Sequence, residues 1–386
     1  MPSQTQDFSH LPLKGYRVIE LGHSVAAPYG ALVLAEMGAE VIKVERPGVG
    51  DDARTWGRAS EAGMPPVFRA LNRNKKSVQI DLKSDAGIAQ VKALAKDADA
   101  LIQNLKPGLV DEIGIGPDVL TAENPRLIYV SIHAFGKTGP LAKRPGYDPL
   151  MQAFGGIMST QGMPGGASVR VGTSIVDMGT GLWAAMGVMA GLLRREKTGK
   201  GGIVDASLYE TALGWMVYFL PMFAASGQLP PKAGSGVSMI SPYQAMRTAD
   251  SELVLAAGND NLFAKLSRAL GHPEWIDDPR FRTNGDRVDN KPELIALIEE
   301  VTTTKPTAHW IEVMEEAGIP YAPVQTIDQV AGHEQTAALG ILREDEAGRP
   351  GYFGLPISFE GRRPDRNEPP PVLGRDDEAF GGKNKC

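Results

Sequence analysis

Cysteine is almost absent from this sequence. The single cysteine, Cys386, is the last of 386 residues, so an internal disulfide and a thiolate metal site are both excluded. The histidines, at positions 10, 23, 133, 272, 309 and 333, are scattered without the spacing of metal ligands. We therefore expect no metal site, and this cysteine usage is consistent with a reducing compartment such as the cytoplasm.

Long apolar runs and an excess of positive charge are also missing. No stretch reaches about 18 unbroken apolar residues, and the nearest, Leu182–Leu193, is short and rich in Gly and Ala. The first residues are polar and lack the apolar core of a secretory signal. The formal net charge is −6, which argues against nucleic-acid binding. We expect a cytoplasmic protein with neither a nucleic-acid nor a membrane partner.

The N-terminal half instead shows a regular alternation of short apolar segments and helical patterns. Two apolar segments flanking one helical pattern form a βαβ unit, in which the strands are parallel and the crossover is right-handed. Repetition of this unit predicts an α/β fold with a Rossmann-like, doubly wound parallel sheet. The expected strands cover 17–21, 40–45, 77–82, 100–104 and 127–132, and the expected helices cover 28–37 and 84–96.

This sheet lacks the signals of a nucleotide site. The first strand-to-helix turn reads GHSVAAPYG, without the G-x-G-x-x-G that lets a backbone approach a pyrophosphate. A Walker A sequence and a G-x-S-x-G elbow are missing as well. Dehydrogenase, ligase and serine hydrolase activities are therefore not expected.

Composition shifts predict three segments. We expect a large Rossmann-like domain over 1–224, a smaller α/β domain over 225–325, and a C-terminal segment over 326–386 that returns to the large domain. The stretch 134–172 is rich in Gly and Pro, which is typical of a functional loop. The stretch 221–236 has the composition of a linker, and 354–359 that of a strand.

One acid stands where a polar segment becomes a long apolar run. Asp177 begins the run, and Gly179 and Gly181 follow it. Basic residues and then Gly199 close the run, so it is predicted to be a helix with Asp177 at its N-terminus. The commonest role of such an Asp is an N-cap, while the helix dipole also favours an ionised carboxylate there.

Five motifs, in their order and spacing, resemble the family III CoA-transferases, the group that includes formyl-CoA transferase and the carnitine and bile-acid CoA-transferases. They cover nearly the whole chain and read RVIELGHSVAAPYGALVLAEMGAEVIKVERPGVGDDAR, NRNKKSVQIDLK, NLKPG, RPGYDPLMQA and SIVDMGTG. The resemblance implies an interlocked homodimer and a catalytic aspartate at Asp177. It implies no permanently bound cofactor, because the CoA thioester is itself a substrate.

The resemblance also implies the residues that contact CoA, and the cations among them suit its phosphate charges. They are Val25, Ala26, Arg46, Ile80, Lys83, Asn104, Leu105, Lys106, Lys143 and Arg144. Residues expected to support the site are Tyr147, Asp148, Gly179 and Gly181, with the two glycines leaving backbone N–H groups open to an oxyanion.

The family mechanism implied here is covalent. The Asp177 carboxylate attacks the donor thioester to form a mixed anhydride, the released CoA thiolate converts this to an aspartyl-CoA thioester, and an acceptor carboxylate completes the exchange. Lys137 and Arg170 offer positive charge for a second carboxylate, which favours a dicarboxylate such as succinate. Nearby apolar side chains suggest room for an acid larger than formate, namely Met151, Phe154, Met158 and Met163.

The sequence departs from formyl-CoA transferase at two single positions and in one loop. Val25 replaces a glutamine, which makes formate and oxalate less expected as substrates, and Glu112 replaces a CoA-contacting arginine. The glycine-rich active-site loop of that enzyme corresponds to the shorter Gly234–Tyr243, which is either a lid or an interdomain linker.

Two other functions stay open from sequence. An α-methylacyl-CoA racemase shares this fold, but its histidine position holds Tyr147, a poor base at neutral pH. A non-catalytic CoA-binding protein is the second alternative, and the presence of Asp177 with its flanking glycines argues against it.

Overall fold

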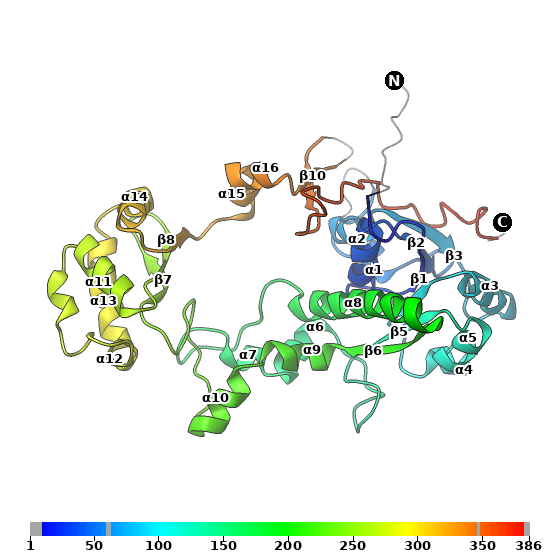
Figure 1. Cartoon of the computed structure of the whole chain (residues 1–386), viewed down its shortest axis with the longest axis horizontal. Coiled ribbons are helices and arrows are strands. Elements are labelled where there is room, and N and C mark those ends of the chain that lie inside the picture. Colours follow the sequence, from blue (N-terminus) through cyan, green and yellow to red (C-terminus); the bar gives the residue numbers. More distant parts are fainter. Residues whose placement is uncertain (1–9, 59–62, 346–347, 382–386) are drawn as a thin grey trace. The chain divides into compact units, whose positions relative to one another are not determined.

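The structure is a computed structural model that describes residues 10–58, 63–345 and 348–381 (Figure 1). The only cysteine of the chain, Cys386, lies outside these residues. Two compact units are distinguished. Unit 1 comprises Met1–Gly155, Val171–Trp215 and His333–Cys386, and unit 2 comprises Gly156–Arg170 and Met216–Gly332. The division of the chain into domains at 224/225 and 325/326 stays a prediction.

Unit 1 contains a six-stranded, fully parallel sheet in the order β3-β2-β1-β4-β5-β6. This order is that of the Rossmann fold, and the predicted doubly wound α/β sheet is confirmed. The strands are β1 (Arg17–Leu21), β2 (Glu40–Glu45), β3 (Lys75–Gln79), β4 (Ala100–Gln103), β5 (Ile128–His133) and β6 (Gly202–Ser207).

Helices cover both faces of this sheet (Figure 1). Those that pack on it or continue from it are α1 (Ala26–Glu36), α2 (Pro66–Asn72), α3 (Asp85–Lys96), α4 (Leu109–Glu112), α5 (Pro117–Glu123), α6 (Asp148–Phe154), α8 (Ile175–Thr198) and α9 (Leu208–Trp215), with the 3-10 helix η1 (Asp52–Thr55). The C-terminal part of unit 1 adds α16 (Glu334–Leu339) and the hairpin β10 (Leu342–Glu344) and β11 (Pro350–Phe353).

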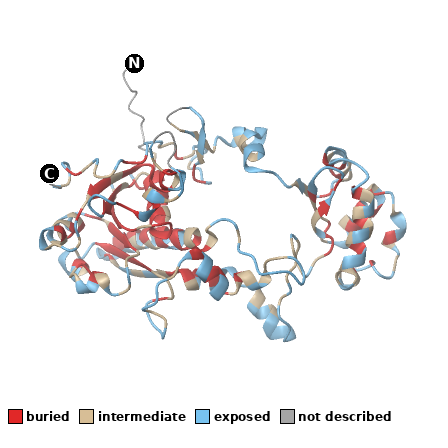
Figure 2. Ribbon diagram, turned by 180° about the vertical axis from the view of Figure 1, so that it is seen from behind, coloured by how far each residue is buried: buried red, intermediate tan, exposed pale blue. Residues whose placement is uncertain are grey.

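The two faces of the sheet differ in chemistry. Ile19, Ile42 and Val78 point to one face and pack with side chains of α3 and α5 into an apolar core. Because side chains alternate along a strand, Glu20 and Lys43 point to the opposite face, and both are fully buried. Buried residues concentrate in these strands and in α1 and α8 (Figure 2). The sheet therefore carries charged side chains in its interior.

Helix α8 packs very closely on α1. A Cβ added at Gly181 would lie 2.6 Å from the carbonyl oxygen of Ala26 and 2.9 Å from the backbone nitrogen of Gly30. A Cβ at Gly30 would lie 2.7 Å from the carbonyl oxygen of Gly181. The atoms that the added Cβ would meet are backbone atoms, which cannot rotate away. The helices can therefore approach this closely only because both positions are glycine.

Gly181→Ala is expected to lower the free energy of unfolding by about 3 kcal/mol, because the new methyl group must push α8 away from α1. Urea denaturation followed by circular dichroism measures this change. Gly214→Ala in α9 is the matched control, since a Cβ there meets no atom within 4 Å. Equal stability of the two variants would contradict the close packing of α1 on α8.

Helix α8 is also long and apolar enough, by length and composition alone, to span a membrane. Buried core helices of other proteins meet the same criteria, and 44% of its most apolar window is buried within the structure. Its packing against α1, β5 and β6 accounts for the buried part of this apolar character.

Unit 2 contains a three-stranded antiparallel sheet in the order β7-β8-β9 with helices around its own apolar core. The strands are β7 (Tyr243–Arg247), β8 (Glu252–Ala256) and β9 (Tyr321–Pro323). The helices are α7 (Ile157–Thr160), α10 (Phe219–Ser226), α11 (Asp260–Ala269), α12 (Asn284–Asp289), α13 (Lys291–Thr302), α14 (Thr307–Ala317) and α15 (Ile327–Gly332), with the 3-10 helix η2 (Pro273–Ile276).

Several local predictions need correction. The strand expected over 77–82 lies at Lys75–Gln79. The strand expected over 354–359 is not formed, and the hairpin of β10 and β11 lies just before these residues instead. The expected linker begins inside α10, whose apolar residues form a helix despite Pro221. The loop expected over 134–172 contains α6 and α7. Helix α6 includes Pro149, which stands in the first turn, where a helix tolerates proline.

Candidate active site

Two adjoining cavities lie where the carboxyl ends of the parallel strands meet, the usual position of a ligand site in such a sheet. We name the first, of about 220 Å³, the aspartate cavity because Asp177 lines it. The second, of about 230 Å³, is named the arginine cavity because Arg46 lines it. The two cavities share His23, Leu105 and Lys106, so they form neighbouring parts of one surface.

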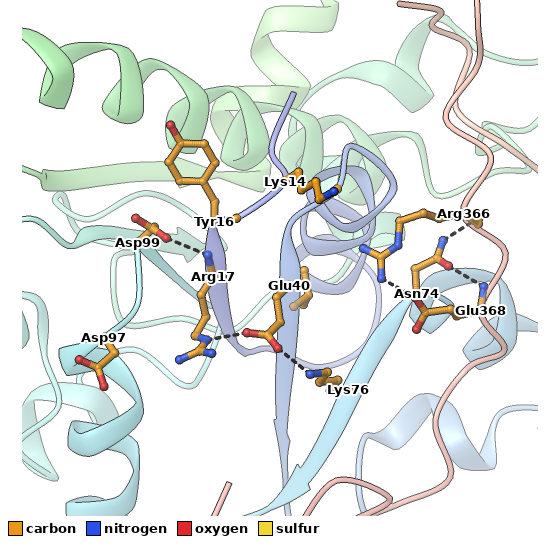
Figure 3. Close-up of a pocket in the computed structure, with 13 residues that line it drawn as sticks. Lys14, Tyr16, Arg17, Glu40, Asn74, Lys76, Asp97, Asp99, Arg366 and Glu368 are labelled. Atoms are coloured by element: carbon orange, nitrogen blue, oxygen red, sulfur yellow. Dashed lines mark hydrogen bonds and ion pairs between the residues drawn. The ribbon is translucent and has the colours of Figure 1, made fainter. Parts of the chain in front are cut away.

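A larger cavity of about 640 Å³ lies at the opposite, amino-terminal ends of the strands (Figure 3). Its charged side chains pair with one another: Glu40 Oε2 lies 2.6 Å from Arg17 Nε, and Glu40 Oε1 lies 2.5 Å from Lys76 Nζ. Neither Asp177 nor any residue expected to contact CoA lines this cavity. We therefore place the candidate site at the carboxyl ends.

Asp177 is the third residue of α8, and it does not cap the helix. Ser174 occupies the N-cap position without a side-chain hydrogen bond. The buried Asp148 of α6 supplies the cap instead, since its Oδ2 accepts hydrogen bonds from the backbone N–H groups of Val176 at 2.8 Å and Asp177 at 3.2 Å. The predicted N-cap role of Asp177 is therefore wrong, and its side chain remains available to the cavity.

The same cap changes the role expected for the two glycines. The backbone N–H of Met178 donates to Ser174, so together with the groups bound by Asp148 the first turn of α8 is engaged. A Cβ at Gly179 would lie 2.7 Å from the Trp215 ring, and Gly181 faces α1. Their geometry suits close packing of α8 rather than the donation of hydrogen bonds to an oxyanion.

Electrostatics favour the neutral form of Asp177 more than is usual for an aspartate. Burial raises the pKa of its carboxyl, and the negative charge of Asp148 raises it further, to about 7. A carboxylate with a raised pKa in a cavity is a candidate nucleophile, because its anion is poorly stabilised and therefore reactive.

The turn between β1 and α1 forms the wall shared by both cavities. The side chain of Asn104 binds both backbone groups of His23: Oδ1 accepts from its N–H at 3.0 Å, and Nδ2 donates to its carbonyl at 2.9 Å. Ser24 adopts a positive φ of 67°, and its N–H donates to Asp51 Oδ1 at 3.0 Å. Burial lowers the pKa of the His23 ring. The turn is thus fixed by side chains from two other segments.

The structure brings together most of the residues expected to contact CoA. Those that line the aspartate cavity with Asp177 are Val25, Ala26, Asn104, Leu105 and Lys106, and the expected supporting residue Tyr147 lines it as well. Those that line the arginine cavity are Arg46, Ile80, Leu105 and Lys106.

Other expected residues lie outside the cavity walls. Lys83, Lys143 and Arg144 are exposed, the last two directly before the lining residues Pro145–Tyr147. Lys137 pairs with Asp205, the Nζ–Oδ2 distance being 3.1 Å, and so it does not offer the free charge expected for a substrate carboxylate.

The apolar side chains expected near the site are divided between the two units. Met151 is buried, Phe154 packs against Tyr209, and Met158 and Met163 belong to unit 2 with Arg170. Gly234–Tyr243 also belongs to unit 2, where Asn284 and Arg287 bind its backbone at Met239 and Ser241.

Several residues of the site were not predicted from sequence. His23, Asp52 and His133 line the cavities, and Asp51 fixes the first turn. His133 Nε2 lies 3.0 Å from Asp205 Oδ1. The signal for the acids was present in the motif GVGDDAR, which follows β2 as the first turn follows β1, so both segments reach the same edge of the sheet.

Together these features suit a group-transfer enzyme: a parallel α/β sheet, a carboxylate of raised pKa in a cavity and cations beside it. The model of CoA-transferase family III matches residues 13–377. The chain therefore belongs to CoA-transferase family III, and the predicted enzyme class, a CoA-transferase, is confirmed.

Named relatives agree with this assignment. The chain is 36% identical to the mouse succinyl-CoA:glutarate CoA-transferase over 367 residues, which cover 94% of this chain and 84% of the relative. It is 38% identical to the acetyl-CoA:oxalate CoA-transferase of Acetobacter aceti over 332 residues, 86% of this chain and 85% of the relative. A CaiB/BaiF family protein from Brucella suis matches with a TM-score of 0.86 at 36% identity, covering 96% of this chain and 98% of that one.

Proposed function

We propose that this enzyme moves CoA from a dicarboxylic acyl-CoA to a dicarboxylic acid through covalent intermediates on Asp177. The observation that carries the proposal is the position of Asp177, whose half-buried carboxylate lines a cavity beside Val25, Asn104 and Lys106. Attack on the thioester carbonyl forms a mixed anhydride and releases CoA thiolate. The thiolate then attacks the anhydride to form an aspartyl-CoA thioester and frees the donor acid.

The second half of the reaction reverses the first. The acceptor carboxylate attacks the aspartyl-CoA thioester, and CoA thiolate leaves and then recaptures the acyl group from the new anhydride. One thioester replaces another, so the reaction needs no net oxidant, reductant or phosphate. CoA thioester is a substrate, and we propose no permanently bound cofactor.

CoA in this proposal occupies the arginine cavity and reaches Asp177 across the first turn. Lys106 lines the cavity and supplies positive charge for its phosphates, and Ile80 supplies an apolar surface. Arg46 also lines the cavity, in an ion pair with Asp52 that CoA phosphates would replace. The exposed Lys83, Lys143 and Arg144 extend this positive charge along the rim. Asp148 supports the site by capping α8, and Gly179 and Gly181 support it by close packing.

The substrate proposal rests on relatives as well as on residues. The mouse relative is named for succinyl-CoA and glutarate, and the Acetobacter aceti relative for acetyl-CoA and oxalate. Val25 argues against oxalate, because an amide that orders small substrates in formyl-CoA transferase is missing. We therefore propose succinyl-CoA as donor and a dicarboxylate of four or more carbons as acceptor, and place oxalate in the test panel.

The direct test is acyl exchange from succinyl-CoA and acetyl-CoA to a panel of acids, followed by mass spectrometry of the CoA thioesters. We expect glutaryl-CoA from succinyl-CoA and glutarate, and little product from formate. Wash-in of deuterium at the α-carbon of a 2-methylacyl-CoA without exchange would instead support the racemase alternative. CoA binding with neither reaction would support the non-catalytic alternative.

We further propose that the enzyme is a cytoplasmic homodimer of the interlocked type, with no nucleic-acid or membrane partner. The family resemblance and the exposed apolar side chains of α8 support it: Trp183 is 45% exposed, Met186 52% and Leu193 70%. Such large apolar side chains on one helix are typical of an interface.

Light scattering is expected to give a dimer mass that persists on dilution, because interlocked chains cannot separate without unfolding. A monomer at low concentration would contradict the interlocked dimer. The double variant Met186→Lys, Leu193→Lys is expected to reduce the yield of dimer, while Lys96→Met on the exposed surface of α3 is not.

A further inference from the structure

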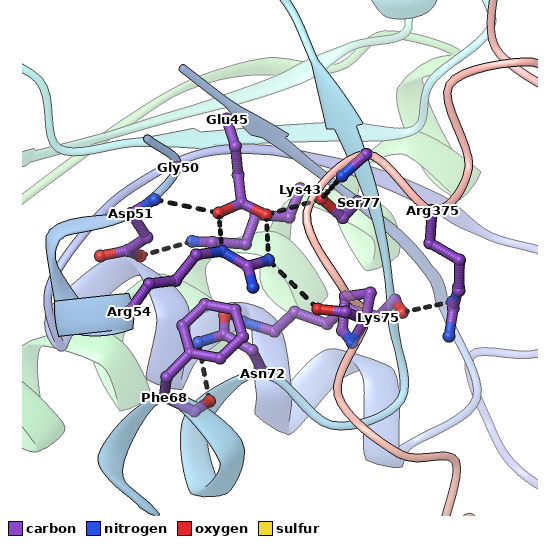
Figure 4. Close-up of polar contacts among 12 residues, drawn as sticks. Lys43, Glu45, Gly50, Asp51, Arg54, Phe68, Asn72, Lys75, Ser77 and Arg375 are labelled. Carbon is purple, nitrogen blue, oxygen red and sulfur yellow. Dashed lines mark hydrogen bonds and ion pairs between the residues drawn. The ribbon is translucent and has the colours of Figure 1, made fainter. Parts of the chain in front are cut away.

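Five charged side chains are buried together between the sheet and α1 in unit 1 (Figure 4). We name them the buried ion cluster: Glu20 of β1, Lys43 and Glu45 of β2, Asp51 of the following turn, and Lys75 of β3. Each is at most 4% exposed. Burial of charges is costly, and well-packed apolar residues often give equal or greater stability. Stability alone therefore does not explain this cluster.

The two lysines of the cluster bind different backbone segments. Lys43 Nζ lies 2.6 Å from Glu20 Oε1 and 2.7 Å from Asp51 Oδ2, and it donates to the carbonyl oxygen of Gly22 at 2.9 Å. Lys75 Nζ lies 2.8 Å from Glu20 Oε2 and donates to the carbonyl oxygen of Pro28 at 2.8 Å. Lys43 thus reaches the turn that precedes α1, whereas Lys75 reaches Pro28, the third residue of α1 itself.

Asp51 links Lys43 to the same turn. Its Oδ1 accepts hydrogen bonds from the backbone N–H groups of Ser24 at 3.0 Å and Ala53 at 2.9 Å. Ser24 has a positive φ, a conformation that an L-residue adopts only when its surroundings hold it there. The Asp51 carboxylate therefore holds the one residue of the turn whose backbone is least favourable on its own.

A second layer holds Asp51 in turn. Glu45 Oε2 accepts a hydrogen bond from the backbone N–H of Asp51 at 2.9 Å. Arg54 binds both Glu45 oxygens, each at 2.7 Å, and its guanidinium lies 3.9 Å from the centre of the Phe68 ring. Figure 4 shows this chain of contacts running from Arg54 through Glu45 and Asp51 to Lys43.

We propose that Lys43 and Asp51 are positioning residues for CoA, which hold the Gly22–Ser24 turn in the conformation that the CoA thioester binds. This inference rests on the proposed function, since the turn forms the wall shared by the aspartate and arginine cavities. Lys43 fixes the carbonyl of Gly22 and lines neither cavity, whereas Asp51 fixes the N–H of Ser24 and also lines the arginine cavity.

The cluster also provides its own control residue. Lys75 is as buried as Lys43 and pairs with the same Glu20, but it touches α1 instead of the turn. Lys75→Met removes a buried cation without removing a hydrogen bond to Gly22, His23 or Ser24. Asp51→Ala removes the acceptor of the Ser24 N–H, and Asp51→Asn retains an acceptor oxygen at the same place.

The experiment measures CoA binding by isothermal titration calorimetry, kcat in the exchange assay, and thermal midpoints, on the full-length wild type and these three variants. We expect Asp51→Ala to raise the Kd for CoA at least about tenfold while kcat changes much less. We expect Asp51→Asn to recover most of the affinity. Lys75→Met should leave the Kd within about twofold, even where its midpoint falls as far as that of Asp51→Ala.

Two results would overturn the inference, and they differ from failure of the proposed function. Equal CoA affinity in wild type and Asp51→Ala excludes a positioning role, and so does a loss in Lys75→Met that matches the loss in Asp51→Ala. Absence of CoA binding by the wild type refutes the proposed function and this inference with it. If Asp51→Ala does not fold, Lys43→Met decides the question by the same readout.

Discussion

Replacement of Asp177 with asparagine is expected to lower kcat for CoA transfer by at least about 10³-fold. Asparagine has nearly the same size and keeps the packing of α8, but its amide does not form the anhydride. Because each intermediate of the proposed mechanism is bonded to this side chain, every turnover should require it. The measurement is the rate of glutaryl-CoA formation from succinyl-CoA and glutarate under saturating conditions.

The control for this variant is Asp118→Asn. Asp118 is also an aspartate in the first turn of a helix, but it belongs to α5 and lines neither cavity. Its replacement should leave kcat unchanged. A second readout is chemical: wild type incubated with succinyl-CoA should carry a CoA adduct on Asp177 that mass spectrometry detects, and Asp177→Asn should carry none. Normal turnover by Asp177→Asn would refute the covalent mechanism.

The sequence was sufficient to predict the sheet because its strands are short, apolar and separated by helical patterns. It was not sufficient to predict what the polar residues within those strands do. Glu20 and Lys43 stand among apolar residues, and alternation places them on one face, yet only the structure shows that they are buried and paired. Pairing across strands depends on register, which a single strand does not encode.

The site was predictable in its position but not in its details. Asp177 could be singled out because it opens the longest apolar run of the chain. Its apparent capping role was wrong, since Asp148, 29 residues earlier, binds the N–H of Asp177. A sequence pattern detects a cap within a few residues, but it does not detect a carboxylate brought to the helix by a separate element.

The glycines of α8 illustrate the same limit. Their small size indicated a close approach, and the structure bears this out, but the approaching group at Gly181 is the backbone of α1 rather than a ligand. A glycine pattern gives the space that a neighbour can occupy, and the fold decides which neighbour occupies it.

The activity is expected to fall about a hundredfold between its plateau and pH 5, since only the ionised carboxylate attacks the thioester. Burial and the negative charge of Asp148 raise the pKa of Asp177 to about 7. Protonation therefore removes the nucleophile as the pH falls below 7, and above about pH 8 the rate should be constant. The measurement is kcat/KM for succinyl-CoA across pH 5 to 9, which reports groups of the free enzyme.

Asp148→Asn tests the cause of this profile. Removal of the negative charge leaves burial as the remaining cause, so the pKa of Asp177 should fall and the midpoint of the profile should move to lower pH. The plateau rate should also fall, because the amide is a weaker acceptor for the first-turn N–H groups of α8. Asp118→Asn should leave the midpoint in place. A midpoint that is unchanged in Asp148→Asn would assign the titration to a different group, and a profile flat to pH 5 would show that the pKa of Asp177 is not raised.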